Sequence, residues 1–571
     1  MRERAWIGGH ALYCRAPMRR LILFLALCLL PASALARGAV AAAHPDASEA
    51  GAEILREGGS ATDAALAMML ALTVVEPQSS GIGGGGFLVR HDGTTGIVRT
   101  IDGRETAPAA ARADRFLGED GEPIGFREAF QGGHAVGVPG NVALMAQAHA
   151  RWGRLPWARL FEPAIRLAGE GFEVNERLHG FLVRFAPLWE RFPEARAIYH
   201  VDGRPAPAGA VIRNPALAGT LRLIAEQGAE AFYRGPVAAE IAAKASEAEV
   251  NPAPLTLADL AAYEAKLRPA VCGRYRAYKI CGMGPPSSGP ITAIQILGMI
   301  ERFGIGAMGP RDPRAWHILF EAMRLAYAVR EQWLADRDFI AVPVAGLIDR
   351  AYLARRSALI SPRRARRDHP HGTPPGAGRR SAAEAGERGG TSHFVAVDGE
   401  GNIVSMTSTV EAPFGSQLVA GGFFLNNELT DFSFAPERGA APVANRVEPG
   451  KRPLSSMTPV IVYDAGNRPV LALGSAGGKR IIMHVVKTLI GVLDWDLPVA
   501  EAIALPNIYF DEEAAIVEEG TFLAAMEPAL EALSGPVEVA EQNSGVHALQ
   551  RTAEGWVGAA DPRRPGVAIR E

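Results

Sequence analysis

The sequence lacks the signatures of several common enzyme classes. Its 571 residues include four cysteines but no CxxC or HExxH pattern, so nothing in it predicts a metal site or a cofactor. The absence of a G-x-S-x-G pattern disfavours a hydrolase with a nucleophile elbow. The net charge of −3, with no strongly basic face, argues against a nucleic-acid partner. The composition, 48% hydrophobic and 21% charged, is that of an ordinary globular protein.

Long apolar runs are also scarce. One run near the N-terminus, Leu21–Leu30, follows two arginines and precedes an Ala-x-Ala pattern, an order typical of a signal peptide. The run is shorter than the roughly 20 apolar residues that a membrane span needs. We therefore predict a signal peptide over residues 1–36, with Met18 as the candidate true start, and a periplasmic or secreted protein. An uncleaved membrane anchor is the alternative.

The cysteines divide between this leader and the rest of the chain. Cys14 and Cys28 lie in the predicted leader, which leaves Cys272 and Cys281 in the exported protein. An even pair in an oxidising compartment is compatible with a disulfide, although two residues nine apart on strands need a turn between them in order to meet. Two buried thiols remain the other reading.

A glycine-rich segment, residues 81–86, matches G-x-G-x-x-G formally. It follows an apolar helix that is predicted to begin at the capping box Ser60–Asp63 and to end at Val75, and it leads into a predicted strand at 87–89. This is the reverse of the order in a dinucleotide-binding turn. We therefore predict no nucleotide there, but close backbone packing where side chains do not fit.

Periodicity divides the remaining chain into two parts. From about residue 142 to 360 it is mostly helical, with predicted helices over Asn141–Trp152, Pro163–Gly169, Pro236–Ala248 and Pro313–Leu334. Residues 391–571 predict one helix over Lys479–Leu493 and strands at 392–397, 402–409, 459–464, 469–474, 547–551 and 556–560. Strands followed by a helix indicate a sheet packed against helices.

Between the two parts lies a tether, about residues 361–390, rich in Pro, Gly, Arg and Ala. Its arginines indicate a solvated loop rather than a nucleic-acid arm. The tether ends at Gly390-Thr391, where a predicted strand begins, and such a junction is where a chain could be cut. A cut there gives Thr391 a free α-amine beside its own hydroxyl, which makes a base and a nucleophile in one residue. Taken alone, Thr391 could equally be a plain strand residue.

The surrounding motifs carry a resemblance. Gly390-Thr391-Ser392-His393, Thr407-Ser408-Thr409 and Asn426–Ser433 resemble the gamma-glutamyltranspeptidase (glutathione hydrolase) family. Other segments resemble the same family in the same order, namely Glu76–Gly81, Gly137–Gly140, Pro285–Gly289, Lys451–Met457 and Gly474–Gly478. Each motif alone is weak, but the ordered set is specific and covers nearly the whole chain after the leader.

The resemblance implies an α+β fold, a four-layer αββα sandwich of the N-terminal-nucleophile type. It implies a precursor that cuts itself into a large subunit, residues 37–390, and a small subunit, residues 391–571, which stay together as a heterodimer. Thr391 would attack a γ-glutamyl donor such as glutathione, and water, an amino acid or a dipeptide would accept the acyl group. Thr409 would hydrogen-bond the nucleophile, and the N–H groups of Gly477 and Gly478 would hold the oxyanion.

The resemblance also supplies donor-binding residues. The α-carboxylate of a γ-glutamyl group needs a bidentate cation and hydroxyls, and Arg104, Ser455 and Ser456 match the family's set. The α-ammonium needs carboxylates, and Glu428 and Asp431 match.

Two features depart from the family's pattern. Glu411 stands where bacterial members have Asn, which adds negative charge to the ammonium site. The segment 434–450 looks shorter than the lid loop of some relatives, which implies a more open site. Two other functions therefore stay open, a cephalosporin- or glutaryl-type acylase of the same fold and a non-catalytic exported binding protein.

Overall fold

The structure is a computed structural model of the uncut chain, and it describes residues 38–378, 389–439, 441–510 and 514–571. The predicted signal peptide and part of the predicted tether, residues 379–388, lie outside the described residues. In the described ranges no helix is both long and apolar enough to cross a membrane.

One sheet has seven strands in the order β24-β1-β11-β12-β2-β3-β8, and all neighbours are antiparallel. Its strands are β1 (Gly38–Ala42), β2 (Gly85–His91), β3 (Val98–Gly103), β8 (Lys266–Arg268), β11 (Gly390–Asp398), β12 (Ile403–Glu411) and β24 (Val567–Arg570). The predicted strands at 392–397 and 402–409 are thus confirmed as β11 and β12. The edge strand β24 and its neighbour β1 were not predicted.

The other large sheet has six antiparallel strands in the order β23-β22-β18-β17-β10-β9. Its strands are β9 (Val271–Tyr275), β10 (Tyr278–Gly282), β17 (Val460–Tyr463), β18 (Pro469–Gly474), β22 (His547–Thr552) and β23 (Gly555–Ala560). Contacts of β1 with β23, of β11 with β22 and of β12 with β18 bring the two sheets together.

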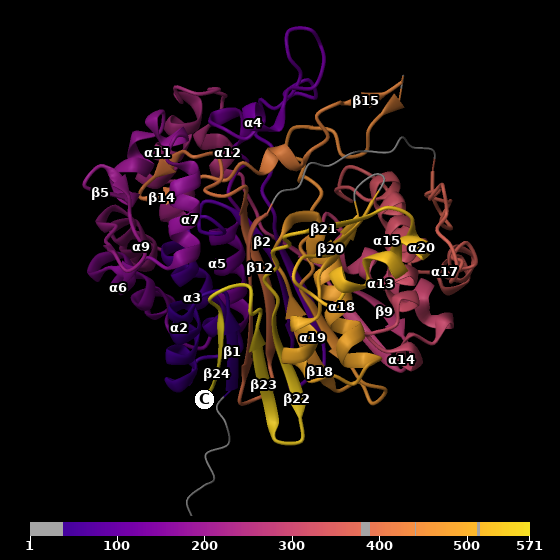
Figure 1. Cartoon of the computed structure of the whole chain (residues 1–571). Helices are drawn as coiled ribbons and strands as arrows, with labels where there is room; N and C mark the ends of the chain where they lie inside the picture. Colours follow the sequence, from indigo (N-terminus) through magenta and orange to yellow (C-terminus); the bar gives the residue numbers. More distant parts are fainter. Residues whose placement is uncertain (1–37, 379–388, 440, 511–513) are drawn as a thin grey trace, which may run out of the picture. The chain divides into compact units, whose positions relative to one another are not determined.

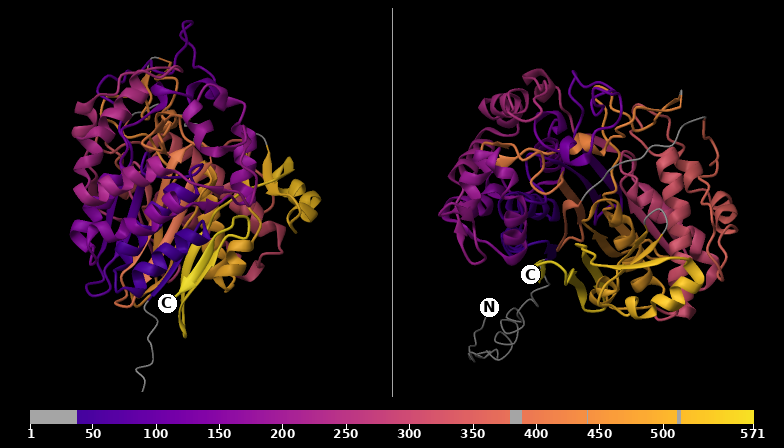
Figure 2. Two further views of the ribbon diagram at one scale, coloured as in Figure 1. Left: turned by 90° about the vertical axis from the view of Figure 1, so that its left-hand side faces the viewer. Right: turned by 45° about the horizontal axis from the view of Figure 1, so that its top comes forward.

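Helices cover the outer faces of both sheets (Figure 1). On the seven-stranded sheet, α2 (Pro45–Arg56) and α3 (Ala61–Val75) pack on β1, β11 and β12, and α5 (Asn141–Trp152) packs on β2 and β3. On the six-stranded sheet lie α13 (Gly289–Ile300) and α18 (Ile481–Leu493), with α15 (Pro313–Trp333) packed against α13. Figure 2 shows strands between the indigo and magenta helices and the salmon and gold ones.

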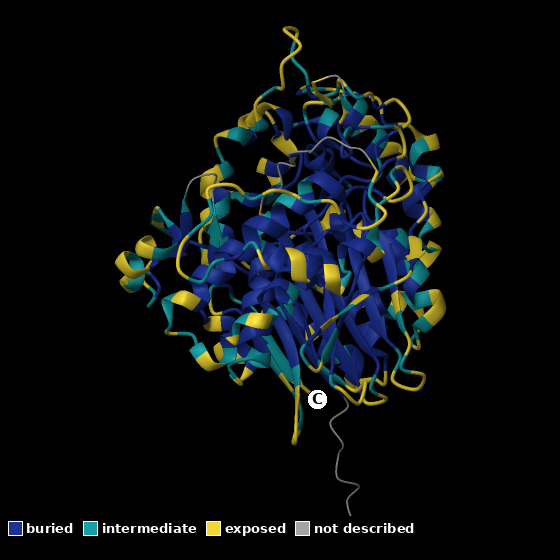
Figure 3. Ribbon diagram, turned by 90° about the vertical axis from the view of Figure 1, so that its right-hand side faces the viewer, coloured by how far each residue is buried: buried dark blue, intermediate teal, exposed yellow. Residues whose placement is uncertain are grey.

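Alternation along β11 shows how one strand serves two cores. Phe394 and Ala396 belong to the core shared with α3, whereas Val395 and Val397 belong to the core between the two sheets. Successive side chains of a strand point to opposite faces, so a strand covered on both faces is apolar throughout. Figure 3 shows this central region as buried.

The remaining elements are shorter and lie around this frame. The other α-helices are α4 (Phe126–Ala129), α6 (Glu162–Glu170), α7 (Glu176–Phe185), α8 (Pro193–Tyr199), α9 (Pro215–Gln227), α10 (Glu230–Tyr233), α11 (Pro236–Ser246), α12 (Leu257–Ala261), α14 (Ile305–Met308), α16 (Val344–Leu347), α17 (Arg350–Ser357), α19 (Val499–Ala504) and α20 (Glu527–Ser534). The other strands are β4 (Phe172–Glu173), β5 (His200–Val201), β6 (Arg204–Pro205), β7 (Val211–Ile212), β13 (Val419–Ala420), β14 (Phe423–Phe424), β15 (Glu437–Arg438), β16 (Ala441–Pro442), β19 (Ile508–Phe510), β20 (Ala515–Glu518) and β21 (Val537–Ala540).

The predicted capping box and glycine packing are both confirmed. The Asp63 N–H donates to Ser60 Oγ over 3.1 Å, and the Ser60 N–H donates to Asp63 Oδ2 over 2.9 Å, at the start of the fully buried helix α3. A Cβ atom on Gly83 would lie 2.1 Å from the Phe424 carbonyl oxygen, and one on Gly84 would lie 1.9 Å from that of Thr409. These glycines therefore allow backbone segments to touch beside the N-terminal end of β11.

The two cysteines form a disulfide, which decides the alternative that the sequence left open. Cys272 on β9 and Cys281 on β10 are direct cross-strand partners with Cα atoms 4.1 Å apart. The required turn lies between the strands, where Arg276 has φ of 50°.

Residues 361–378 of the tether contain no helix or strand, as predicted, but hydrogen bonds attach them to neighbouring helices. The Ala365 N–H donates to the Leu533 carbonyl over 2.7 Å, and the Trp333 indole N–H on α15 donates to the Gly372 carbonyl over 3.1 Å. Residues 361–378 are almost all exposed or half-buried, as expected of a solvated loop, and hydrogen bonds fasten them to α15 and α20.

Candidate active site

Thr391 and Thr409 face each other across the β11–β12 pair. The register shifts between Gly390 and Thr391, so that Gly390 pairs with Glu411 and Thr391 pairs with Thr409. Such a bulge leaves one extra residue on β12 and re-aims the side chains beside it. The Oγ1 atoms of the two threonines lie 3.1 Å apart, and both residues are buried.

The hydrogen bonds around Thr409 fix the direction of this contact. Thr409 Oγ1 donates to the carbonyl oxygen of Gly390 and accepts from the N–H of Glu411 over 2.9 Å. A hydroxyl has one hydrogen, and that of Thr409 is used on Gly390. Thr391 is therefore the donor in the Thr391–Thr409 contact. The hydroxyl of Thr409 polarises the carbonyl that precedes Thr391, the carbonyl of the predicted cut.

Gly390 and the preceding residue are held close to other backbone. A Cβ on Gly390 would lie 2.4 Å from the carbonyl oxygen of Glu411, so only glycine fits there. A Cβ on Gly389 would lie 4.0 Å from Cα of Gly477. The end of the tether therefore passes directly beside the glycine pair that the sequence singles out as an oxyanion site.

Gly477 and Gly478 stand at the start of α18. Their φ angles are 131° and 59°, a region that residues with a Cβ rarely adopt. They open the 3₁₀ turn η7 (Gly478–Arg480), which runs into α18. The N–H groups at a helix start carry partial positive charge and attract anions.

Eight of the ten predicted site residues line one cavity. The cavity is small, with a volume of about 10 Å³, and Met457 and Ile481 complete its wall. The predicted residues that line it are Arg104, Thr391, Thr409, Glu411, Glu428, Asp431, Ser455 and Gly478. Arg104 directly follows β3, Thr391 lies on β11, and Thr409 and Glu411 lie on β12. The other four come from segments more than 300 residues beyond Arg104.

Arg104 follows β3 and is 1% exposed. Its guanidinium donates to Glu428, to Asp431 Oδ2 over 2.5 Å, and to the carbonyl oxygen of Leu454 over 2.8 Å. Burial alone lowers its pKa, but the nearby carboxylates outweigh burial and raise the pKa above its usual range. Arg104 is thus a permanently charged group at the wall of the cavity.

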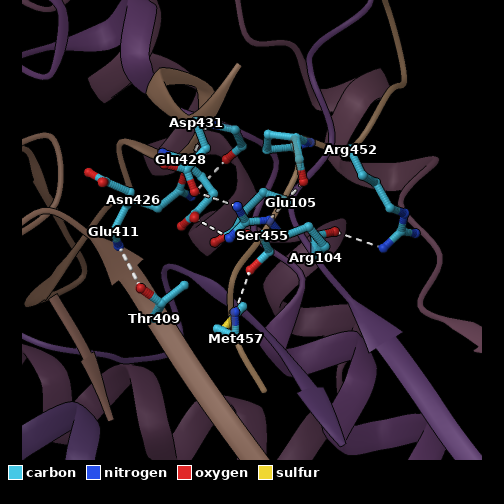
Figure 4. A network of polar contacts seen from close by, with 12 residues as sticks. Arg104, Glu105, Thr409, Glu411, Asn426, Glu428, Asp431, Arg452, Ser455 and Met457 are labelled. Atoms are coloured by element: carbon cyan, nitrogen blue, oxygen red, sulfur yellow. Dashed lines mark hydrogen bonds and ion pairs between the residues drawn. The ribbon is translucent and has the colours of Figure 1, made fainter. Parts of the chain in front are cut away.

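The cavity holds more carboxylates than this one guanidinium can balance (Figure 4). Glu428 and Asp431 lie on the 3₁₀ turn η6 (Glu428–Asp431), Glu411 ends β12, and Glu105 follows Arg104. Burial raises the pKa of Glu105 to about 7 and raises that of Glu428 well above its usual range; Glu105 and Glu411 raise the latter further. The four carboxyl groups together therefore hold a proton near neutral pH. An added cation would be electrostatically favourable beside them.

Glu105 is the residue of this cluster that was not predicted. It is fully buried, and its closest ion-pair contact is with Arg104 at 3.9 Å. A Cβ on Gly85 would lie 2.3 Å from Glu105 Oε2, so that glycine makes room for the carboxylate. Its place directly after Arg104 was the only available signal in the sequence.

Ser455 and Ser456 have different surroundings. Ser455 lines the cavity, and its carbonyl accepts from both the N–H and the Oγ of Ser288 over 2.7 Å. The hydroxyl of Ser456 accepts from Arg330 of α15 over 3.0 Å and does not line the cavity. Ser288, from the motif Pro285–Gly289, thus fixes the main chain at Ser455. Gly477, the other predicted residue outside the lining, lies directly beside Gly478.

Glu411 has an unusual backbone. Its φ is 76°, a left-handed value that is uncommon for a residue other than Gly, Asn or Asp. Its carboxylate accepts from the side-chain amide of Asn427 over 2.5 Å. The bulge and this hydrogen bond together direct the carboxylate toward the cavity.

The segment 434–450, predicted to be short, forms a small hairpin of β15 and β16. Phe434, at its start, stacks on Phe116 with ring centroids 4.6 Å apart. In the described ranges, no group of three or more His, Cys, Asp or Glu has an arrangement that could hold a metal ion. The cavity lining offers three hydroxyls, backbone N–H groups, one guanidinium and several carboxyls.

Sequence comparison finds a match to the family model described as gamma-glutamyltranspeptidase, over residues 47–570. The glutathione hydrolase proenzyme of Bacillus subtilis (strain 168) is 37% identical over 481 residues, which are 83% of this chain and 80% of that protein. The acylase ACY 1 proenzyme of Pseudomonas sp. (strain V22) is 35% identical over 492 residues, 85% of this chain and 84% of that protein.

Structure comparison gives a related result. The crystal structure of a cephalosporin acylase from Bacillus halodurans superposes with a TM-score of 0.83 and 27% sequence identity, covering 94% of this chain and 96% of that one. The mixed α+β fold is therefore shared with a solved acylase across nearly the full length.

Proposed function

Because the chain belongs to the gamma-glutamyltranspeptidase family, we propose that it is an exported glutathione hydrolase and γ-glutamyltransferase that cuts itself between Gly390 and Thr391. The leader predicted over residues 1–36 supports export to the periplasm or the medium. Thr391 is then the N-terminal nucleophile, and no cofactor takes part.

The observation that carries this proposal is the hydrogen-bond chain Thr391–Thr409–Gly390. The Thr391 hydroxyl attacks the Gly390 carbonyl carbon, which Thr409 polarises, and the Gly390–Thr391 C–N bond breaks as an ester forms. The released nitrogen takes up the proton and becomes the α-amine of Thr391. Water then hydrolyses the ester, which leaves a Gly390 carboxylate and a free Thr391 hydroxyl.

The two subunits complete each other's sheets, which supports a heterodimer. In the seven-stranded sheet, β11, β12 and β24 come from residues 391–571, and the other four strands come from residues 37–390. Strand β1 lies between β11 and β24, so neither subunit can form this sheet alone. Two facing sheets with helices on their outer sides support the proposal of a four-layer αββα sandwich of the N-terminal-nucleophile type.

The same groups serve the donor reaction. The Thr391 amine removes the proton of its own hydroxyl as the oxygen attacks the γ-carbonyl. The N–H groups of Gly477 and Gly478 stabilise the oxyanion, each by roughly 3 kcal/mol. The leaving amine departs with the proton, and water, an amino acid or a dipeptide then resolves the γ-glutamyl ester.

Donor recognition uses the charges of the cavity. The α-carboxylate binds the Arg104 guanidinium with the hydroxyl of Ser455, whereas Ser456 acts only as its neighbour, bound to Arg330. The α-ammonium binds Glu428, Asp431 and Glu411. In the free protein, Arg104 is paired with Glu428 and Asp431. The donor's α-carboxylate gives the guanidinium a new partner, and its α-ammonium gives the two carboxylates a new partner. Every buried charge therefore still has a partner of opposite sign after binding.

A second candidate is a cephalosporin- or glutaryl-type acylase, and the similarity to a solved cephalosporin acylase favours it. A glutaryl group carries no α-ammonium and would bring a further carboxylate to a cavity where Arg104 is already paired with Glu428 and Asp431. Adding a buried anion without an accompanying cation is unfavourable by several kcal/mol. The surplus of carboxylates therefore favours the γ-glutamyl donor.

The test is a pair of anilide assays on one preparation. The γ-glutamyl anilide should be hydrolysed at least about tenfold more efficiently than the glutaryl anilide, because one lost charge pair is worth about 1.4 kcal/mol or more. A reversed preference would establish the acylase reading. A single uncut band on a denaturing gel, with no turnover of either anilide, would support the non-catalytic binding protein instead.

A further inference from the structure

A second polar group contacts Thr391 through its main chain. Arg564 lies between β23 and β24, and its guanidinium donates to the carbonyl oxygen of Thr391 over 3.0 Å and to that of Ser544 over 2.7 Å. Its side chain is buried, with 7% of the residue exposed. Arg564 is 173 residues from Thr391 in the sequence and is absent from the predicted site.

The strand pairing explains why the carbonyl of Thr391 needs such a partner. Strand β1 pairs with β11 from Val395 to Asp398 and does not extend to Thr391. A buried carbonyl without a hydrogen bond is unfavourable, and Arg564 supplies the donor beyond the end of β1. Gly545 makes room for this side chain, because a Cβ there would lie 2.7 Å from Nε of Arg564.

The charged groups around Arg564 come from several elements. Glu76 at the end of α3 and Asp561 after β23 are anionic, whereas Arg177 of α7 is cationic and is paired with Glu76 over 2.8 Å. Burial is the main cause that lowers the pKa of Arg564, to about 9. Burial also lowers the pKa of the neighbouring His547, and the charge of Arg564 lowers it further, to about 4. At neutral pH, Arg564 is therefore charged and His547 is neutral.

We propose that Arg564 is a positioning residue for the nucleophile: it holds the main chain of Thr391 after the cut and keeps a positive charge beside the new α-amine. This inference rests on the proposed function, because the amine exists only if Thr391 becomes an N-terminus. The guanidinium is thereby a tuning group for the base of the reaction.

Covalent geometry sets the distance between the two charges. The nitrogen and carbonyl oxygen of one residue are about 3 Å apart, so the guanidinium nitrogen lies within about 6 Å of the amine. A cation at that distance disfavours the ammonium form and lowers the amine's pKa. The neutral form, which alone accepts a proton, then persists to lower pH.

The charged groups on the cavity side of the amine have opposite effects on its pKa. Glu411, Glu428 and Asp431 favour the ammonium form, and Arg104 opposes them. These groups are unchanged by a substitution at Arg564. The difference between wild type and variant therefore reports Arg564 alone.

The test compares three substitutions in the mature, self-cut enzyme. Arg564→Met should move the acidic limb of kcat/KM for the γ-glutamyl anilide upward by about one pH unit. Arg564→Lys keeps the charge and should leave the limb within about 0.3 unit of wild type, although the lost hydrogen bond lowers the rate. The matched control is Arg570→Met, a change at another arginine of the C-terminal segment that is exposed and donates to the Glu554 carbonyl.

Labelling of the amine gives a readout without turnover. Limited reductive methylation across a pH series, followed by mass spectrometry of the Thr391 peptide, measures the pKa of the amine. In wild type we expect a value below the ordinary range of about 7.7–8.0 for an α-amine. This measurement needs no variant, so it tests for a lowered pKa of the amine even if Arg564→Met does not fold.

Two results would overturn the inference. One is an Arg564→Met enzyme whose acidic limb and labelling curve match those of wild type. The other is a wild-type Thr391 amine with a pKa of about 8 or above. If wild type instead carries no new N-terminus at Thr391, the proposed function itself fails, and that outcome is distinct from both.

Discussion

Thr391 has two polar environments of opposite character. Its side chain faces a cavity lined by Glu411, Glu428 and Asp431, which outnumber the guanidinium of Arg104 in that lining, and Glu105 lies beside Arg104. Its main-chain carbonyl accepts from the buried guanidinium of Arg564, whose other charged neighbours are Glu76, Asp561 and Arg177. The first environment is suited to bind the ammonium of a substrate, and the second is suited to repel a proton from the nucleophile's own amine.

The difference shows how one buried region can treat two amines in opposite ways. A donor's α-ammonium must stay charged to be bound, whereas the Thr391 amine must be neutral to act as a base. Charge of one sign around both amines would favour one task at the expense of the other. Separate contacts, one through the side-chain cavity and one through the backbone, remove that conflict.

The largest expected effect is loss of the residue between the two environments. Thr391→Ala should remain a single chain and show no detectable anilide turnover, because both reactions need its hydroxyl. Thr391→Ser, the matched control, keeps the hydroxyl and should still be cut. Denaturing gels and the γ-glutamyl-anilide assay measure both; cleavage of Thr391→Ala at the same bond would rule out self-processing by this residue.

The next effect removes the only guanidinium of the cavity side. Arg104→Ala should lower kcat/KM for the γ-glutamyl anilide by a factor of about 30 to 5,000, equivalent to about 2–5 kcal/mol for one half of a desolvated charge pair. Arg104→Lys should also lose activity, since lysine cannot form the fork.

Self-cleavage should survive in both Arg104 variants, because Arg104 does not touch the Gly390–Thr391 bond. Arg112→Ala is the control, an arginine whose side chain is 81% exposed. Unchanged donor kinetics in Arg104→Ala would remove Arg104 from the donor site.

A smaller effect reduces the negative charge on the cavity side. Glu411→Asn should keep γ-glutamyl-anilide turnover within about threefold of wild type or improve it, because the φ of 76° suits asparagine and the other carboxylates remain. Loss of a nearby anion lowers the pKa of the Thr391 amine, so the acidic limb should move to lower pH, opposite to the shift expected for Arg564→Met. Loss of most activity would instead make Glu411 an essential ammonium ligand.

The smallest effect concerns stability. With its pKa raised to about 7 by burial, Glu105 keeps its proton in the folded protein where an unfolded chain has already lost it. Its contribution to folding is therefore lost as pH rises from about 4.5 through 7. In the uncut Thr391→Ala background, Glu105→Gln should raise the free energy of unfolding at pH 8 by up to about 3 kcal/mol. This gain should appear as a higher Tm at pH 8 and as little change in Tm at pH 4. An equal change in Tm at both pH values would contradict a raised pKa.

Much of this arrangement could be predicted because it is local in the sequence. The capping box before α3, the strands β11 and β12 and the glycines of 81–86 each follow from short patterns, and the structure confirms them. The family motifs led to eight of the residues that line the cavity.

The rest depends on contacts that no short pattern contains. Glu105 is adjacent to Arg104, yet only the packed cavity shows that its carboxylate turns inward. Arg564 reaches Thr391 because β24 returns to the edge of the sheet beside β1, a pairing between the two ends of the chain. Ser456 turns toward Arg330 of α15, although the adjacent Ser455 lines the cavity. The sequence gives no sign of this difference between the two serines.

The most direct test of the central claim is the N-terminal sequence of the smaller chain in purified wild-type protein. We expect Thr-Ser-His-Phe, beginning at Thr391, and an intact mass that corresponds to residues 391–571. A smaller chain that begins at any other residue, or a protein that stays uncut while it hydrolyses the γ-glutamyl anilide, would contradict the assignment of Thr391 as an N-terminal nucleophile.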